Sequence, residues 1–210
     1  SLDLLGAVLE VADDRSLDAV LRARVLDPLG MSDTSFTYPG PARLATLYEM
    51  ADDGTLVCSD VSSEASATPV TTFSGGGGLY STAPDYLRFV QMLRRGGELD
   101  GVRVLSDAAV SAMRTNQLPG DLASYGQPSY NETPTDGVGF GLGGSVVVDP
   151  LVTAWRSAPG EYAWGGWANT AFWIDPVHDL SVVFMTQVIP SDRTRFRAEL
   201  RALVADHLWT

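Results

Sequence analysis

The sequence predicts an α+β fold in which an antiparallel sheet is flanked by helices. In the N-terminal part, apolar residues recur mainly at helical spacing. Between residues 138 and 187, short apolar runs alternate with turns, and one further helical pattern follows them. Grouped rather than alternating strands and helices are typical of this class. The change places a boundary near residue 138, with helices and loops in 1–137 and sheet strands plus a C-terminal helix in 138–210.

Composition excludes some partners. The chain has 210 residues, 45% of them hydrophobic, and is long enough for one sizeable core. Its net charge is -12, from 26 acidic and 14 basic residues, and every basic residue is arginine. Nucleic acids and anionic membranes need a basic surface. We therefore expect neither as a partner.

Cys58 is the single cysteine, so no internal disulfide can form. This leaves the localisation unknown, with the cytoplasm slightly favoured over secretion. No apolar run approaches the roughly 18 residues of a membrane span, and no signal-peptide pattern is present. Ser1 has no initiator methionine before it, and a helical pattern starts at once. We expect that the chain begins inside a larger protein.

The first two elements are predicted helices. Residues 2–12 carry an apolar face, and Ser16 is placed to cap a second helix that ends at Pro28. The apolar face of the first helix is formed by Leu2, Leu5, Val8 and Leu9. Residues 37–72 are mostly irregular, with 43–50 and 54–58 as short strand or helix candidates.

A glycine run, 75–78, precedes a strongly marked helix start. Thr82 and Asp85 fit a capping box, Pro84 lies in the first turn, and the helix should bury Leu87, Val90 and Leu93. A glycine run before a helix can bind phosphate. No lysine follows it and no long strand precedes it. We therefore expect tight packing of this turn rather than phosphate binding.

A helix is expected over 106–115, followed by a loop over 116–137. The loop is rich in Pro, Gly, Ser, Tyr and Asn, and its Tyr125 and Tyr130 could line a pocket. A packed loop without a binding role is the alternative.

Strands are expected within 138–149, 161–168, 171–175 and 180–187. Ser191 or Asp192 should then cap a final helix whose buried stripe is Phe196, Leu200, Leu203, Val204 and His207 or Leu208. The run 181–186 is apolar without alternation, as expected of a strand covered on both faces and paired on both sides. No earlier segment is an obvious second neighbour for it.

Several sequence motifs lack the neighbouring secondary structure or the spacing that their usual function requires. Residues 139–144 match G-x-G-x-x-G, but a strand rather than a helix should follow, so dinucleotide binding is not expected. His178 and His207 show no metal-ligand spacing, and we expect no metal or other cofactor. Without G-x-S-x-G and with both histidines poorly placed, a Ser-His-Asp triad within the chain is not expected either.

The stretch around Gly165 and Gly166, between Trp164 and Trp167, is a poor strand former. Glycine in a strand marks a bulge or a place where a ligand or another backbone comes close. Access for a substrate and a packing bulge under two aromatic side chains both fit this pattern.

Several stretches together resemble the C-terminal portion of serine hydrolases with the class C β-lactamase and penicillin-binding-protein fold, which include the family VIII carboxylesterases. They keep the family's order over nearly the whole chain and lie at 16–18, 25–36, 74–89, 97–101, 139–143 and 164–166. The resemblance implies a β-lactamase/transpeptidase-like fold whose N-terminal strands and Ser-x-x-Lys helix are missing from this chain.

The resemblance also implies three catalytic elements. In Ser-x-x-Lys the serine attacks a carbonyl to form an acyl-enzyme, and in a Tyr-x-Asn-like element the tyrosine relays its proton. The third element is a Lys-Thr-Gly-like triplet on a strand. This chain has no lysine and no Tyr-x-Asn, so only the third element is present, as Trp164-Gly165-Gly166. The chain alone is therefore expected to be inactive.

The triplet differs from that of relatives that use Lys and Thr to hold a substrate carboxylate. Trp164 and Gly165 offer neither group, which favours a neutral small-molecule ester. By position, the backbone N–H of Trp167 would be one donor of the oxyanion hole. We expect Trp164, Gly165, Gly166 and Tyr125 to bind the substrate.

The resemblance further implies that the last strand pairs with an N-terminal strand absent here. We therefore expect the N-terminal part of the same enzyme as a partner, either as a second chain or as a cleaved segment. A carboxylesterase is the predicted activity. β-Lactamase, D-peptidase or acyltransferase activity and a non-catalytic binding protein on the same scaffold are the alternatives.

Overall fold

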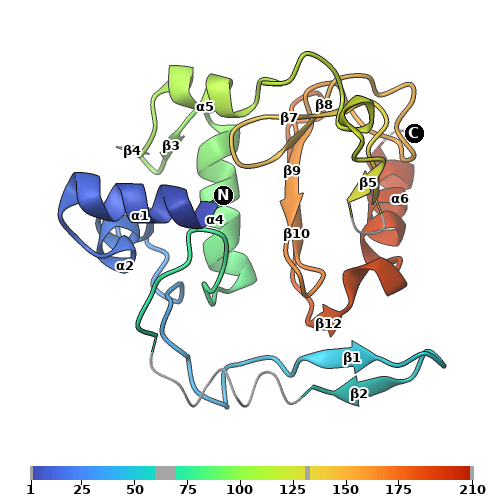
Figure 1. Cartoon of the computed structure of the whole chain (residues 1–210). Coiled ribbons are helices and arrows are strands. Elements are labelled where there is room, and N and C mark those ends of the chain that lie inside the picture. The colour runs from blue at the N-terminus through green and yellow to red at the C-terminus, as the bar shows by residue number, and fades with distance from the viewer. Residues whose placement is uncertain (1, 60–69, 131–132, 209–210) are drawn as a thin grey trace.

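The computed structural model describes residues 2–59, 70–130 and 133–208. Its centre is a five-stranded antiparallel sheet of order β11-β10-β9-β8-β7, which lies between helix α4 and helix α6 (Figure 1). The predicted antiparallel sheet flanked by helices is confirmed. Its strands are β7 (Val138–Phe140), β8 (Ser145–Val147), β9 (Tyr162–Gly165), β10 (Ala171–Asp175) and β11 (Leu180–Phe184).

The N-terminal helices form where the pattern predicts them. Helix α1 covers Leu2–Asp13, α2 covers Leu17–Leu21, and a π-helical turn, η1, continues to Leu26. The Ser16 hydroxyl caps α2 by accepting from the N–H of Ala19. The apolar face of α1 is exposed, however, and only Gly6 of this helix is buried. Helical spacing predicts the helix, but it cannot say what covers the face.

Helix α4 (Ala83–Arg94) begins as predicted, with the Thr82 hydroxyl accepting from the N–H of Asp85. The second half of a capping box is missing, because the buried Asp85 carboxylate accepts instead from the N–H of Asp33 and the hydroxyl of Thr34. Asp85 therefore ties the start of α4 to the turn after η1. Helix α5 (Asp107–Met113) is capped by Ser106 in the ordinary way.

The glycine run before α4 is packed against α1, as expected. A Cβ on Gly75 would lie 2.1 Å from the carbonyl oxygen of Leu2. The Asp3 carboxylate accepts from the N–H of Gly76 and the hydroxyl of Ser74. A carboxylate in this position repels other anions, which agrees with the rejection of a phosphate site.

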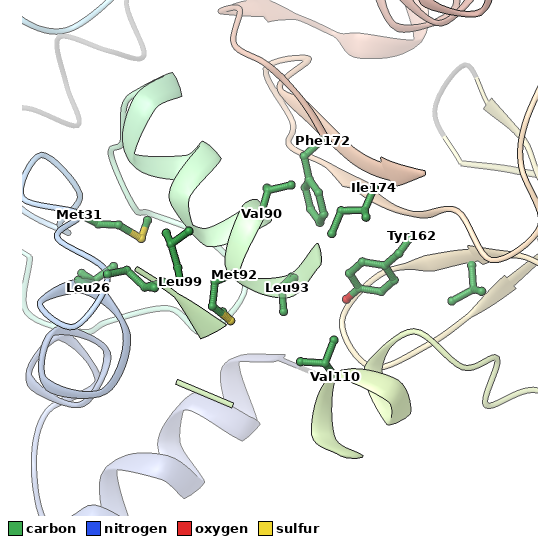
Figure 2. Packing of buried hydrophobic residues seen from close by; sticks show 12 residues of the cluster. Leu26, Met31, Val90, Met92, Leu93, Leu99, Val110, Tyr162, Phe172 and Ile174 are labelled. Atoms are coloured by element: carbon green, nitrogen blue, oxygen red, sulfur yellow. The ribbon is translucent and has the colours of Figure 1, made fainter. Parts of the chain in front are cut away.

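An apolar cluster lies around α4, partly between this helix and the sheet and partly on the side of the helix away from the sheet (Figure 2). From α4 it contains Val90, Met92 and Leu93, each 0% exposed. Tyr162, Phe172 and Ile174 come from strands β9 and β10, and Leu26 and Met31 come from the segment after α2. Both predicted parts of the chain therefore share one core, and the boundary at residue 138 stays a prediction.

The glycine-rich match at 139–144 forms the β7–β8 hairpin. The N–H of Gly141 donates to the carbonyl of Gly144 (2.8 Å), and no helix follows. A Cβ on Gly141 would lie 2.0 Å from the carbonyl oxygen of Met113. These glycines allow close packing of the hairpin against α5, and the exclusion of a dinucleotide fingerprint agrees with this context.

Smaller sheets surround this core. Strands β1 (Tyr48–Met50) and β2 (Leu56–Cys58) pair antiparallel, and β12 (Val188–Ile189) pairs parallel to β1. This pairing of segments 140 residues apart was not expected from the sequence. Two short hairpins complete the strands: β3 (Glu98–Leu99) with β4 (Val102–Arg103), and β5 (Ser129–Tyr130) with β6 (Thr133–Pro134).

The predicted start of the last helix is wrong, and its predicted buried stripe is wrong in part, since Phe196, Leu200 and Val204 are half-buried. Ser191–Arg193 forms a separate 3-10 turn, η3, and Thr194 is extended, so α6 spans Phe196–Leu208. Leu203 and His207 are exposed, whereas Arg197 is 8% and Ala205 5% exposed. The inner face of α6 carries arginines because their guanidinium groups find carbonyl, carboxylate and aromatic partners on the sheet.

Strand β11 is the outermost strand of the central sheet in the described part of the chain. It pairs with β10 on one side, from Leu180↔Asp175 to Phe184↔Ala171. The second neighbour that its uninterrupted apolar sequence predicts is absent from the residues described. None of the described helices combines the length and the hydropathy of a membrane-spanning segment.

Candidate oxyanion site on the β9–β10 turn

The turn between β9 and β10 contains the predicted site residues. Strand β9 ends at Gly165, and Gly166 closes the turn by donating its N–H to the carbonyl of Thr170 (2.8 Å). Asn169 is fully buried at φ 68°, a left-handed conformation that asparagine tolerates. Its side-chain amide donates to the carbonyl of Val188 (3.0 Å). The β9–β10 turn is therefore anchored to strand β12.

The two glycines have a packing role. A Cβ on Gly166 would lie 2.3 Å from the hydroxyl of Thr170, and one on Gly165 would lie 3.0 Å from the guanidinium carbon of Arg197. A larger residue at either position would therefore crowd the Thr170 hydroxyl or the Arg197 guanidinium. Of the two sequence interpretations, the packing role is visible directly, while Gly165 also lines the cavity described below.

Trp167 lies at the tip of this turn with its side chain 62% exposed. Its backbone N–H donates no hydrogen bond to any described residue, although Gly166 and Asn169 beside it donate within the turn. The peptide N–H at this position is thus available to an external acceptor.

A cavity of about 130 Å³ opens beside the turn. Trp164 forms an aromatic wall there: its ring lies 4.8 Å from that of Tyr130 and 5.2 Å, edge to face, from that of Phe140. The remaining lining is largely apolar and includes Leu122, Val138, Trp155, Ala163, Ala171 and Phe172. Such a surface suits an uncharged organic group.

The loop over 116–137 contributes Tyr130 to this cavity, whereas Tyr125 does not line it. Tyr125 ends the 3-10 turn η2 (Ala123–Tyr125) and is 56% exposed. No feature of the sequence distinguishes these two tyrosines as pocket-lining residues. The loop's fold distinguishes them, because the β5–β6 hairpin turns Tyr130 onto Trp164. Substrate binding by Tyr125 stays a prediction.

Sequence reasoning missed the polar groups that α6 places behind the turn. The Arg197 guanidinium donates to the carbonyls of Gly166 (2.6 Å) and Thr170 (3.2 Å). Arg201, one helical turn later, pairs with the buried Glu161 and lies over the rings of Trp155 (4.9 Å) and Trp173 (4.6 Å). An i, i+4 arginine pair on a helix facing aromatic strands was the available signal.

Burial raises the pKa of Glu161, and the neighbouring Arg201 opposes this shift. Desolvation likewise raises the pKa of Tyr162 to about 12, and its phenol donates to the carbonyl of Leu142 (2.8 Å). Tyr162 is therefore a neutral structural phenol rather than a base. The described residues contain no group of three or more His, Cys, Asp or Glu side chains that could hold a metal ion.

The comparisons with known proteins agree with this fold. The family described as Beta-lactamase matches residues 1–206, and the chain belongs to that family. Its fold is β-lactamase/transpeptidase-like, and its family and structural neighbours are serine hydrolases, esterases among them.

Two curated relatives and one solved structure illustrate the likeness. The chain is 38% identical to Protein Rv1367c of Mycobacterium tuberculosis over 198 residues, which are 90% of this chain and 48% of the relative. It is 31% identical to Esterase EstB of Burkholderia gladioli over 201 residues, 89% of this chain and 48% of that protein. The structure of EstCE1, a hydrolase with promiscuous acyltransferase activity, superposes with a TM-score of 0.78 at 26% identity and covers 97% of this chain and 54% of EstCE1. The chain thus spans about half the length of its relatives.

Proposed function

We propose that this chain is the C-terminal part of a serine carboxylesterase that acts on neutral esters through an acyl-enzyme. The observation that supports this most directly is the N–H of Trp167, which has no acceptor among the described residues and belongs to the turn that follows Gly165, a lining residue of the largely apolar cavity. In the reaction, a serine oxygen attacks the ester carbonyl carbon, and the carbonyl oxygen becomes an anion. Trp167 N–H would donate to that anion, together with the N–H of the serine.

The nucleophile and its bases belong, in this proposal, to a segment outside these residues. The chain has no lysine and covers 48% of the length of Esterase EstB. The N-terminal part of the same enzyme, as a second chain or a cleaved segment, would supply the serine, the lysine and the tyrosine. Residues 1–210 alone would then polarise a carbonyl but not attack it.

Two uncovered surfaces support such a partner. Helix α1 exposes its apolar face, in which Leu5 is 52% and Val8 54% exposed. Strand β11 is unpaired along one side within the described residues. Isolated apolar faces and open strand edges favour association. The missing half of the enzyme is the occupant that fits both, since a strand would complete the sheet and apolar side chains would cover α1.

The preference for esters rests on the lining of the cavity. Trp164 and Gly165 replace the cation and hydroxyl that would hold a carboxylate, and most of the other lining groups are apolar. One observation favours a second candidate, hydrolysis of anionic amides such as β-lactams or D-peptides: Arg197 also lines the cavity. We rank it second because two backbone carbonyls already accept from this guanidinium.

The test uses the complete protein. Initial rates are compared on a short-chain nitrophenyl ester, a chromogenic cephalosporin and a D-alanyl-D-alanine peptide, and the acyl-enzyme is trapped with a fluorophosphonate and located by mass spectrometry. We expect ester turnover to exceed the other two, with the label on a serine outside residues 1–210. Labelling within this chain, or faster cephalosporin turnover, would contradict the proposal. A protein that binds the ester without turnover would support the non-catalytic alternative.

A further inference from the structure

Arg197 occupies an unusual place for an arginine. It lies in the first turn of α6, is 8% exposed, and reaches the β9–β10 turn with one guanidinium nitrogen. That nitrogen lies 2.6 Å from the carbonyl oxygen of Gly166 and 3.2 Å from that of Thr170. Gly165 leaves the room for it, since a Cβ there would come within 3.0 Å of the guanidinium. The contact therefore depends both on the Arg197 guanidinium and on the absence of a side chain at Gly165.

The carbonyl of Gly166 and the N–H of Trp167 belong to one peptide unit. A trans peptide is planar, so its C=O and N–H point in opposite directions and turn together. A hydrogen bond that fixes the Gly166 oxygen therefore fixes the direction of the Trp167 N–H. Because the donor is a guanidinium, the bond is charge-assisted and also polarises the peptide.

The rest of α6 keeps Arg197 in register with the turn. Arg201 lies one helical turn further and is held by Glu161 and by the rings of Trp155 and Trp173. On the other side, Asn169 and the N–H of Val188 fasten the turn to β12. The peptide between Gly166 and Trp167 is therefore held between two fixed elements rather than free to rotate.

We propose that Arg197 is a positioning residue for acyl transfer, which orients and polarises the Gly166–Trp167 peptide so that the Trp167 N–H meets the developing oxyanion. Arg197 does not touch the reacting atoms and exchanges no proton in this role. The inference rests on the proposed esterase function and names a residue that acts on its transition state. Its effect should fall on kcat rather than on substrate binding.

The test compares Arg197→Lys and Arg197→Gln with Arg195→Lys in the complete protein. Arg195 is an exposed arginine just before the same helix and serves as the matched control. Near-UV circular dichroism identifies the variants that keep the native fold. Gly165→Ala, whose Cβ would lie 2.9 Å from the carbonyl oxygen of Thr170 and 3.0 Å from the Arg197 guanidinium, is the additional variant if neither Arg197 variant folds.

Removing one oxyanion donor costs about 10²–10³ in kcat, so loss of its orientation should cost about 10- to 100-fold. KM for the nitrophenyl ester should change little, and affinity for phenylboronic acid, which forms a tetrahedral serine adduct, should fall in parallel with kcat/KM. Arg195→Lys should match the wild type. A folded Arg197 variant with wild-type kcat, or one that raises only KM, would overturn the inference.

A failure of the esterase proposal would be visible separately, as absence of ester turnover by the wild-type protein. In that case the NMR resonance of the Trp167 amide tests whether Arg197 positions this peptide. It should shift in Arg197→Lys and remain in place in Arg195→Lys if the guanidinium sets this peptide. An unchanged Trp167 resonance in a folded Arg197 variant would overturn the inference whatever the activity.

Discussion

The two faces of the central sheet are built differently. On the face toward α4, strands β9 and β10 present Tyr162, Phe172 and Ile174 to an apolar cluster. On the face toward α6, Glu161 just before β9 and Trp173 of β10 contact one arginine of the helix, Arg201. Successive strand residues point to opposite faces, so one short stretch of sequence supplies both environments.

These two kinds of contact constrain the sheet in different ways. Apolar packing toward α4 is non-directional and tolerates small shifts, whereas hydrogen bonds and ion pairs toward α6 fix distances and directions. Among the described residues on these two faces, Arg197 of α6 reaches the turn that contains Trp167. We infer that both faces stabilise the sheet and that the α6 face in addition positions the candidate oxyanion site.

The largest effect is expected on the α6 face. Arg201→Met removes the partner of the Glu161 carboxylate, whose side chain is 4% exposed, and should destabilise the protein by about 3–5 kcal/mol at pH 7. Chemical denaturation measures this loss. The double variant with Glu161→Gln should recover much of it, because no buried charge is then left unpaired. A double variant as unstable as Arg201→Met would contradict this explanation.

The same pair gives a pH dependence. The pKa of Glu161 is raised in the folded state, so the folded protein holds this proton more tightly than the unfolded chain. The contribution of Glu161 to the free energy of unfolding therefore falls as pH rises from the ordinary glutamate pKa to the raised pKa of the folded state. The Arg201→Met penalty should shrink as pH falls through that window. A penalty that does not change with pH would assign the loss to packing instead.

On the α4 face, Ile174→Ala should cost about 2–5 kcal/mol of stability, because a fully buried side chain leaves a cavity. Its kcat in the complete protein, measured well below the unfolding transition, should remain close to that of the wild type. Leu203→Ala, at an exposed position of α6, is the control and should change stability by about 0.5 kcal/mol or less. A large loss of kcat in folded Ile174→Ala would break the separation of the two faces.

Trp167→Pro tests the turn itself, since proline has no N–H to donate. We expect about 3 kcal/mol of lost transition-state stabilisation, seen as a fall in kcat of the complete protein. Trp167→Phe keeps the peptide N–H and should retain most of the activity. Equal activity of the two variants would show that this N–H is not an oxyanion donor.

The smallest effect concerns the loop that carries Tyr130. The Asp121 carboxylate accepts from the N–H groups of Ser124 and Gly137 and from the Ser124 hydroxyl, and these bonds lower its pKa to about 2. Its contribution to stability is present above the ordinary aspartate pKa and is lost as pH falls from there toward 2. The protection factor of the Gly137 amide, which is the intrinsic exchange rate divided by the observed rate at the same pH, should fall in that window in the wild type and be low throughout in Asp121→Asn. Equal protection in both proteins would contradict this.

Much of the fold follows from local patterns. Thr82 before Pro84 predicts the start of α4, and the strands of the central sheet lie where short apolar runs alternate with turns. These signals are local, because capping and side-chain alternation depend on neighbouring residues. The pairing of β1 with β12 is not local, and no sequence pattern near Tyr48 or Val188 predicts it.

The candidate site could be predicted only in part. The glycines at 165 and 166 mark a close approach, but the sequence does not say that Arg197 and Thr170 are what approaches. Arg197 was missed because a charged residue counts as exposed until its partners are known, and those partners are backbone carbonyls 27 and 31 residues away. The exposed face of α1 was missed for a related reason, since periodicity indicates an apolar face but not what covers it.

We propose that these residues form one wall of an acyl-transfer site and that the attacking group lies outside them. The most direct measurement is the pre-steady-state release of nitrophenol from a short-chain ester by residues 1–210 alone and by the complete protein at equal concentration. We predict a burst of about one equivalent from the complete protein and none from residues 1–210. A burst from residues 1–210 alone would place the nucleophile within this chain and contradict the account.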